Sequence, residues 1–241
     1  MRYLVLSDIH GNWEALEAVL AAARGECDEV ICLGDLVGYG ADPNPVTDWV
    51  RENSRVVVRG NHDKVCCGLE EPALFNASAR AAAIWTGQQL TPENRRYLRE
   101  LPQGPLEHGE FSLTHGSPLD EDEYLVSLRD AVEQFEAAAG RLIFFGHTHV
   151  QGAFFLRAIP HEATRASPGQ LHVSRGETCL LNPGSVGQPR DLDWRAAYAL
   201  WDSESRLATF RRSEYDVAAA QRKILDAGLP PGLAERLEQG R

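Results

Sequence analysis

The sequence lacks the long apolar runs of membrane proteins. A helix needs about 18 consecutive apolar residues to span a bilayer, and no stretch of the sequence approaches this length. The first residues also lead directly into a strand-like segment, without the basic and apolar regions of a signal peptide. We therefore expect a cytoplasmic protein with no membrane partner.

Cysteine is scarce and shows no pairing pattern. The five cysteines form an odd number, and none of them is spaced as a CxxC pair. This argues against a disulfide framework and against a structural zinc site. We expect small buried apolar side chains at these positions.

Positive charge is also in short supply. The 24 lysines and arginines are outnumbered by 35 aspartates and glutamates, which gives a formal net charge of -11. Such a field disfavours long nucleic acids as partners. A small anionic substrate stays compatible, because bound metal ions would set the local potential. The sequence indicates no particular oligomeric state.

The 241 residues, of which 43% are hydrophobic, predict one globular domain over residues 1–241. The first part alternates strand and helix: strands at 3–6, 29–33 and 55–58, and helices at 13–24 and 45–52. This βαβαβ pattern predicts parallel strands with right-handed crossovers.

The rest of the chain predicts a helical cap and a region of short strands. The Ala-rich and Arg-rich segment 77–101 predicts a helical pair that forms a lateral cap. Strands at 111–114 and 142–145 flank a helix near 126–139. Short strands beyond residue 150 predict antiparallel sheet, and we expect them at 152–155, 171–173, 178–181, 196–201 and 207–211. The segment 160–169 reads as a surface loop, and 214–241 as C-terminal helices.

Five stretches with metal-binding side chains occur in a fixed order: Asp8-Ile9-His10, Gly34-Asp35, Gly60-Asn61-His62-Asp63, His115-Gly116 and Gly146-His147-Thr148-His149. Four of them follow runs of β-prone residues, so these polar groups stand where strands end. The carboxyl ends of neighbouring strands meet at one crevice in an α/β sheet. The pattern therefore predicts a single polar site built from distant parts of the chain.

Each stretch also has an ordinary structural interpretation. Asp35 and Asn61 are common turn residues, and His115 could be a hydrogen-bonded core histidine. Residues two apart at a strand end point to the same side, which suits Asp8 with His10. The ordinary interpretations would have to hold at five strand ends at once, so we favour a metal site.

These stretches resemble the motifs of the calcineurin-like metallophosphoesterases, which run DxH, GDxxxxG, GNHD/E, a His-Gly step and GHxH. The resemblance covers roughly residues 4–150. The segment NPGSVGQPR at 182–190 is similar to the NPGSV segment of the small prokaryotic phosphoesterases in that superfamily. The resemblance implies a four-layer α/β/β/α sandwich with a dinuclear metal site at one edge.

The resemblance also implies a ligand set. One metal would take Asp8, His10, Asp35 and His149, and the other Asp35, Asn61, His115 and His147, with Asp35 bridging. The two aspartates remove two of the four positive charges of two divalent ions, and the remainder suits an anionic phosphate. This nitrogen and oxygen ligand set leaves manganese, iron, cobalt, nickel and zinc open. We expect manganese to be the best activator.

A two-metal site activates a bridging water and holds the phosphate oxygens. His62 lies inside the GNHD motif but outside the ligand set, so we expect it to act as the catalytic general acid toward the leaving oxygen. Asn61 and His62 are also expected to contact the substrate phosphate.

The second motif departs from the phosphoprotein phosphatase branch, where it reads GDxVDRG. Gly38 and Tyr39 occupy the positions of that later Asp and Arg. Asp63 is a candidate to support His62 in place of the missing Asp. Without the Arg, a phosphodiester is favoured over a monoester, whose dianionic end benefits from a guanidinium. Arg190 could bind the phosphate instead and reverse this order, or be an ordinary loop arginine.

The sequence therefore predicts a metal-dependent phosphoesterase that acts on small phosphate esters, with phosphodiesters favoured. The alternative is a phosphomonoesterase acting on phosphoproteins or nucleoside polyphosphates. A non-catalytic binding scaffold is less favoured, because every ligand and His62 are present.

Overall fold

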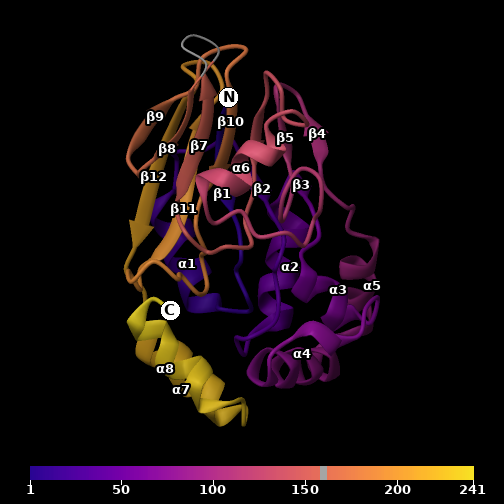
Figure 1. Cartoon of the computed structure of the whole chain (residues 1–241). Coiled ribbons are helices and arrows are strands. Elements are labelled where there is room, and N and C mark those ends of the chain that lie inside the picture. Colours follow the sequence, from indigo (N-terminus) through magenta and orange to yellow (C-terminus); the bar gives the residue numbers. More distant parts are fainter. Residues whose placement is uncertain (158–161) are drawn as a thin grey trace.

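Two six-stranded mixed sheets, packed face to face, form the centre of the computed structural model, which describes residues 1–157 and 162–241 (Figure 1). The first sheet has the strand order β3 (Val56–Val57), β2 (Glu29–Cys32), β1 (Arg2–Leu6), β11 (Ala196–Asp202), β12 (Leu207–Ser213) and β9 (Gln170–His172). The second has the order β4 (Leu106–His108), β5 (Phe111–Leu113), β6 (Leu142–Phe144), β10 (Thr178–Asn182), β7 (Gly152–Arg157) and β8 (Glu162–Ala166).

Helices pack on the outer sides of this sheet pair. Those that share an apolar cluster with the first sheet are α1 (Trp13–Ala22), α2 (Pro43–Asn53), α3 (Asn61–Cys67), α4 (Ala77–Gln89), α5 (Pro92–Glu100), α7 (Val217–Asp226) and α8 (Pro231–Gln239). The short helix α6 (Leu128–Gln134) packs against β7 and β8 of the second sheet. A single 3-10 turn (Pro72–Leu74) precedes α4. None of the helices in the described ranges is long and apolar enough to cross a membrane.

Alternation along the strands produces three separate apolar layers. In β1, Leu4 and Leu6 face the helices, whereas Tyr3 and Val5 face the second sheet. In and just after β6, Phe144 faces the first sheet and Phe145 packs outward. The period of two in the side-chain direction thus gives each sheet two buried faces. The predicted four-layer sandwich is confirmed.

The strand pairing confirms the βαβαβ prediction for the first part of the chain, because β1, β2 and β3 are parallel neighbours. The strands beyond residue 150 do not form one antiparallel sheet. They are divided between the two sheets, and β10 lies parallel to β6. The sequence pattern identifies these strands but carries no signal for which sheet each one joins.

The segment 160–169 is not a simple loop. Strand β8 occupies Glu162–Ala166 and pairs antiparallel with β7, while residues 160 and 161 lie outside the described residues. The prolines at 160 and 168 indicate a loop, but the five residues between 162 and 166 have a partner strand that supplies backbone hydrogen bonds. Helix α6 is also shorter than the predicted 126–139, and β4 and α3 were not predicted.

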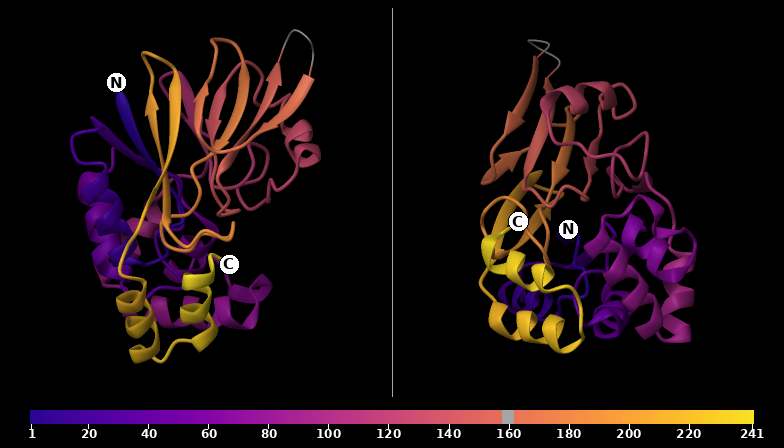
Figure 2. Two further views of the ribbon diagram at one scale, coloured as in Figure 1. Left: turned by 90° about the vertical axis from the view of Figure 1, so that its left-hand side faces the viewer. Right: turned by 60° about the horizontal axis from the view of Figure 1, so that its bottom comes forward.

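Helices are present in the two segments 77–101 and 214–241, as predicted. Helices α4 and α5 lie within 77–101, and α7 and α8 lie within 214–241. Gly228, with φ of 69°, separates the last two helices. Figures 1 and 2 show α7 and α8 at the same end of the molecule as α4, and α7 contacts α1.

Trp201 tests the layer between the two sheets. Its side chain is 2% exposed, and its ring lies 6.1 Å from that of Phe144 across the layer. We expect Trp201→Ala to lower the free energy of unfolding by about 3–5 kcal/mol, because the cavity cannot be filled by neighbours on two rigid sheets. Urea denaturation measures this. Leu119→Ala, at a side chain that is 65% exposed, is the control and should change stability by less than about 0.5 kcal/mol.

Candidate metal centre

The motif side chains converge at the carboxyl ends of the parallel strands in both sheets. They form two buried groups whose ligand atoms all lie within 4.8 Å of one another. The first group is Asp8, His10, Asp35 and His149, and the second is Asp35, His115 and His147. Asp35 is in both groups, so the geometry supports a bridging position for its carboxylate.

Backbone conformation helps to direct these side chains. Five of the candidate ligands have positive φ values: Asp8 (53°), His10 (51°), Asp35 (52°), His147 (64°) and His149 (60°). This conformation is uncommon for residues other than glycine, and each instance costs on the order of 1 kcal/mol. Strained residues cluster at functional sites when the surrounding structure holds them there. Hydrogen bonds such as that from the Asp8 N–H to the Gly34 carbonyl, at 3.1 Å, hold this one.

The orientation of the four histidines is fixed from outside the centre. One nitrogen of each ring contacts a backbone carbonyl: His10 Nδ1 with Val37 (3.0 Å), His149 Nδ1 with Gln188 (2.6 Å), His115 Nδ1 with Leu33 (2.8 Å) and His147 Nε2 with Asp122 (3.0 Å). A carbonyl only accepts hydrogen bonds, so the outer nitrogen of each ring must carry the proton. In the neutral ring the other nitrogen then presents a lone pair to the centre.

These inward nitrogens approach one another closely. His10 Nε2 lies 3.2 Å from His149 Nε2, and His115 Nε2 lies 3.1 Å from His147 Nδ1. In the His10–His149 pair neither neutral ring has a proton left to donate, so the two lone pairs repel unless they share a cation. Asp35 Oδ2 lies 3.5 Å from His10 Nε2 and 3.4 Å from His115 Nε2. The donor set therefore fits two divalent transition metal ions, one at each histidine pair.

Asn61 joins the second group. Its Oδ1 lies 3.2 Å from His115 Nε2, and an amide oxygen is a suitable ligand for a divalent metal. All seven residues predicted as ligands from the sequence are thus brought together.

Burial favours the neutral, ligating form of three of these histidines. It lowers the pKa of His10 and His149 well below the usual value, and that of His147 to about 3. His115 differs: burial lowers its pKa, but the carboxylates of Asp35 and Asp8 outweigh this and raise it to about 10. A bound divalent cation would repel that proton.

Asp8 is held by three segments. The Ser7 hydroxyl donates to its carboxylate at 2.6 Å, the His147 N–H donates at 3.2 Å, and the Ser185 hydroxyl donates to its carbonyl at 2.7 Å. Gly146 permits this close approach, because a Cβ there would lie 2.0 Å from Ser7 Oγ. The NPGSV segment therefore contributes by fixing the backbone of the Asp8 loop.

His62 lies beside the two ligand groups. Its ring is 4.5 Å from that of Phe75, 4.4 Å from Tyr39 and 4.9 Å from His10. Its Nδ1 is buried and has no hydrogen-bond partner among the described residues. Burial lowers the pKa of His62 to about 4. Gly38 leaves room for the ring, since a Cβ there, at φ of 87°, would lie 2.4 Å from Nδ1.

Asp63 does not support His62. Its carboxylate accepts hydrogen bonds from the N–H groups of Leu36 (2.9 Å), Val37 (3.3 Å) and Gly60 (2.9 Å). It therefore caps α3 and fixes the loop after Asp35. Within residues 1–157 and 162–241, no carboxylate is hydrogen-bonded to His62 Nδ1 in place of the missing Asp at position 38.

Arg190 reaches the centre from the loop after β10. Its guanidinium carbon lies 5.7 Å from the Tyr39 ring centroid, and Nη2 donates to Gln188 Oε1 at 3.1 Å. Its Nε is buried without a described partner. Burial raises the pKa of Tyr39 and of Tyr124, and the charge of Arg190 opposes this at both. The guanidinium of Arg190 thus lies beside the aromatic ring that contacts His62.

Two residues near His147 were not anticipated from the sequence. Tyr124 stacks on its ring with centroids 3.7 Å apart. Lys64, only 2% exposed, donates to Glu121 at 3.2 Å and to Asp122 at 2.6 Å, and so fixes the loop whose carbonyl orients His147. The position of Lys64 directly after GNHD is a sequence signal, whereas the loop around Tyr124 carries none.

Comparison with known proteins gives concordant matches. Residues 1–206 match the calcineurin-like phosphoesterase superfamily domain. The uncharacterized protein MJ0912 of Methanocaldococcus jannaschii is 35% identical over 247 residues, which cover 98% of this chain and 97% of that protein. A crystal structure of a metallophosphoesterase from Sphaerobacter thermophilus is 40% identical with a TM-score of 0.87, and covers 100% of this chain and 99% of that one. The class 3 fructose-1,6-bisphosphatase of Streptococcus gordonii is 29% identical over 163 residues, which cover 64% of this chain and 25% of that protein.

Metal content tests the two ligand groups separately. We expect wild-type protein reloaded with manganese and dialysed to retain about two ions per chain. His147→Ala should retain about one, since the group around Asp8 stays whole, and Asp35→Ala should retain neither because it removes the shared ligand. Elemental analysis by mass spectrometry measures this. His172→Ala, at an exposed histidine, is the control; two ions in Asp35→Ala would contradict the bridging assignment.

Proposed function

The chain belongs to the calcineurin-like phosphoesterase superfamily, and from that premise we propose that it is a metal-dependent hydrolase of small phosphate monoesters. The observation that carries this proposal is the pairing of inward histidine nitrogens around Asp35, with Arg190 beside them. A scaffold protein has no need for four histidines oriented in this way. The reaction is the attack of water on phosphorus with departure of the ester oxygen.

The ligand groups identified above would hold two divalent ions. When bound, such ions lower the pKa of water and so supply a hydroxide nucleophile near neutral pH. Manganese is our proposed metal, because it suits a set of imidazole, carboxylate and amide donors without thiolates.

His62 is proposed to protonate the leaving oxygen. With a pKa of about 4 its ring is neutral at neutral pH in the substrate-free protein. A dianionic phosphate close to the ring would raise this pKa by favouring the charged form. The proton would thus be taken up together with the substrate, and the aromatic rings of Tyr39 and Phe75 would hold the imidazole in place.

The position of Arg190 changes the order of substrates expected from the sequence. From the sequence, diesters are favoured because the second motif has no arginine at position 39. Tyr39 stands at that position, and the guanidinium of Arg190 lies over its ring. A guanidinium at this place can contact two oxygens of a terminal phosphate, which is the interaction that favours monoesters. Monoesters therefore come first in our proposal, and the preference for diesters stays as the second candidate.

One relative is consistent with this order. The Streptococcus gordonii protein that matches part of this chain is named a fructose-1,6-bisphosphatase, and its substrate by that name is a phosphate monoester. This supports a monoester for our chain as a class, without identifying the alcohol.

Arg190→Gln tests the order of substrates. We expect kcat/KM for p-nitrophenyl phosphate to fall by roughly 10- to 100-fold, because charge-assisted hydrogen bonds to the dianion are lost. The value for bis(p-nitrophenyl) phosphate should change less than about threefold, since a diester has no dianionic end. Steady-state kinetics of the manganese-loaded enzyme measure both. Arg222→Gln makes the same charge change at an exposed position of α7. Faster diester cleavage by the wild type, or equal losses for the two substrates, would contradict the proposal.

His62→Gln tests the general acid. A leaving oxygen that is already stable as an anion needs little protonation, whereas an alkoxide needs it fully. We expect a loss of about 10²- to 10⁴-fold for glycerol phosphate and of less than about tenfold for p-nitrophenyl phosphate. Metal content should match the wild type, because His62 is outside both ligand groups. Equal losses for the two substrates would assign His62 to phosphate binding alone.

A further inference from the structure

Two arginines from distant segments share the ring of Tyr39. The guanidinium carbon of Arg190 lies 5.7 Å from the ring centroid, and that of Arg236, from α8, lies 5.9 Å from it. The Tyr39 ring is itself 4.4 Å from His62 and 4.7 Å from His10. Both guanidinium groups are thus one aromatic ring away from the candidate catalytic residue and a candidate metal ligand.

Neither arginine is paired with an aspartate or glutamate side chain in the ranges 1–157 and 162–241. Arg190 donates to Gln188 and weakly to the Tyr39 hydroxyl. Arg236 Nε donates to a main-chain oxygen of Arg241, the last residue, and its two Nη groups have no hydrogen-bond partner in these ranges. The chain has 35 acidic residues and only 24 lysines and arginines, so two neighbouring arginines without an acidic side chain beside them are unexpected. Burial, followed by the charge of Arg190, lowers the pKa of the Arg236 guanidinium. An anion beside the two arginines would offset both the burial of the Arg236 charge and its repulsion by Arg190.

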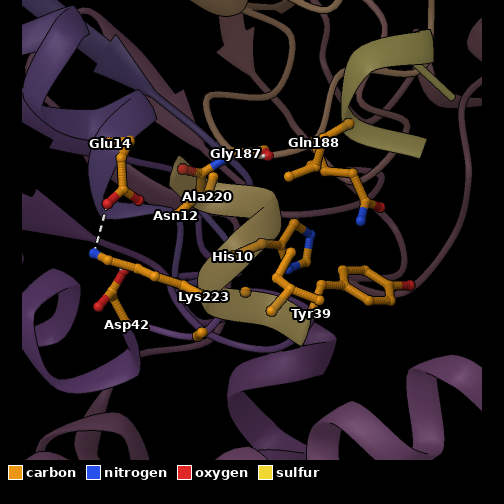
Figure 3. Close-up of a pocket in the computed structure, with 14 residues that line it drawn as sticks. His10, Asn12, Glu14, Tyr39, Asp42, Gly187, Gln188, Ala220 and Lys223 are labelled. Atoms are coloured by element: carbon orange, nitrogen blue, oxygen red, sulfur yellow. Dashed lines mark hydrogen bonds and ion pairs between the residues drawn. The ribbon is translucent and has the colours of Figure 1, made fainter. Parts of the chain in front are cut away.

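The C-terminal helices are held rigidly enough to place Arg236. Lys223 of α7 pairs with Glu14 at 2.5 Å and with Asp42 at 2.7 Å, on segments that flank His10 and Tyr39. Figure 3 shows the small cavity between these segments, with His10 and Tyr39 on one side and Lys223 extended toward Glu14.

A backbone hydrogen bond also links the segments that carry the two arginines. The N–H of Leu192, two residues after Arg190, donates to the carbonyl of Gly240 at the end of α8, at 2.9 Å. The loop that carries Arg190 and the end of α8 are therefore joined by main-chain atoms. Both guanidinium groups are held close to the same ring.

We propose that Arg236 forms a second phosphate subsite next to the one at Arg190, so that the preferred substrates are phosphate monoesters that carry a second phosphate group. This rests on the proposed function, because Arg190 is assigned there to the phosphate that is cleaved. The second phosphate is either joined directly to the first, as in a diphosphate, where the leaving oxygen belongs to the second phosphate, or separated from it by a short carbon chain, as in a sugar bisphosphate, where the leaving oxygen belongs to the alcohol. Both present a second anionic phosphate to a guanidinium.

Matched inhibitors test the subsite. Methylenediphosphonate is compared with methylphosphonate, and propane-1,3-diyl bisphosphonate with propylphosphonate, as inhibitors of p-nitrophenyl phosphate hydrolysis. The enzyme is loaded with manganese, and the free metal ion is held constant in excess so that chelation does not contribute. The readout is the ratio of the two inhibition constants within each pair, which a uniform loss of affinity leaves unchanged.

We expect one of the two diphosphonates to bind the wild type at least about tenfold more tightly than its single-phosphonate partner. Arg236→Gln should reduce this ratio to within about twofold of one, and Arg236→Lys should keep part of it through its charge. Arg222→Gln should keep all of it. The pair that shows the effect tells whether the two phosphates are directly joined or separated.

Two results would overturn the subsite: ratios near one for both pairs in the wild type, or an unchanged ratio in Arg236→Gln. If Arg236→Gln does not fold, the ratio of inhibition constants in the wild type and in Arg236→Lys still tests the subsite. If the wild type fails to cleave p-nitrophenyl phosphate, the proposed function has failed. Calorimetric titration of the manganese-loaded protein with the same four compounds then gives the same ratios without turnover, so the two failures are distinguished.

Discussion

The centre of this protein depends on four peptide carbonyls that each hold the outer nitrogen of a histidine ring. Because a carbonyl fixes the proton on the outer nitrogen, the inner nitrogen of each neutral ring faces Asp35 as a lone pair. Between neutral His10 and His149 this arrangement is repulsive and becomes favourable around a cation, whereas His115, with its raised pKa, would give up its inner proton to a bound cation. The metal-binding character of the site is therefore set by the backbone of the surrounding loops as much as by the ligands.

The two-sheet fold is what brings those carbonyls into place. Parallel strands β1, β2 and β3 end on one side of the centre, and β5, β6 and β10 of the second sheet end on the other. The loops that follow them interlock through Asp8, which accepts hydrogen bonds from Ser7 and His147 and is tied to Ser185. The left-handed conformations of the ligands are tolerated because several segments hold each loop at once.

Features that depend on neighbouring residues in the sequence could be predicted, whereas contacts between distant segments could not. The ligands could be identified because each motif is local: a β-prone run ends, and a side chain with a metal-binding atom follows. The first three strands could be placed in parallel order for the same reason. The partner of β8, the stacking of Tyr124 on His147 and the approach of Arg236 to Tyr39 could not be predicted, because each joins residues that only the finished fold brings together. The sequence did not determine which residue supports His62. Asp63 caps α3 and binds the loop after Asp35, so the side chains of these two adjacent residues serve different parts of the structure.

The use of main-chain carbonyls to orient the histidines has an evolutionary consequence. A carbonyl is the same chemical group whatever side chain is attached to it, so the proton positions at the centre do not depend directly on the side chains of Leu33, Val37, Asp122 and Gln188. Exchange of Leu33 or Val37 for another apolar residue is therefore compatible with an unaltered set of donor atoms, provided that the loops keep their path. Homologues with different residues around the same histidines can in this way diverge in what they accept while inheriting one chemistry.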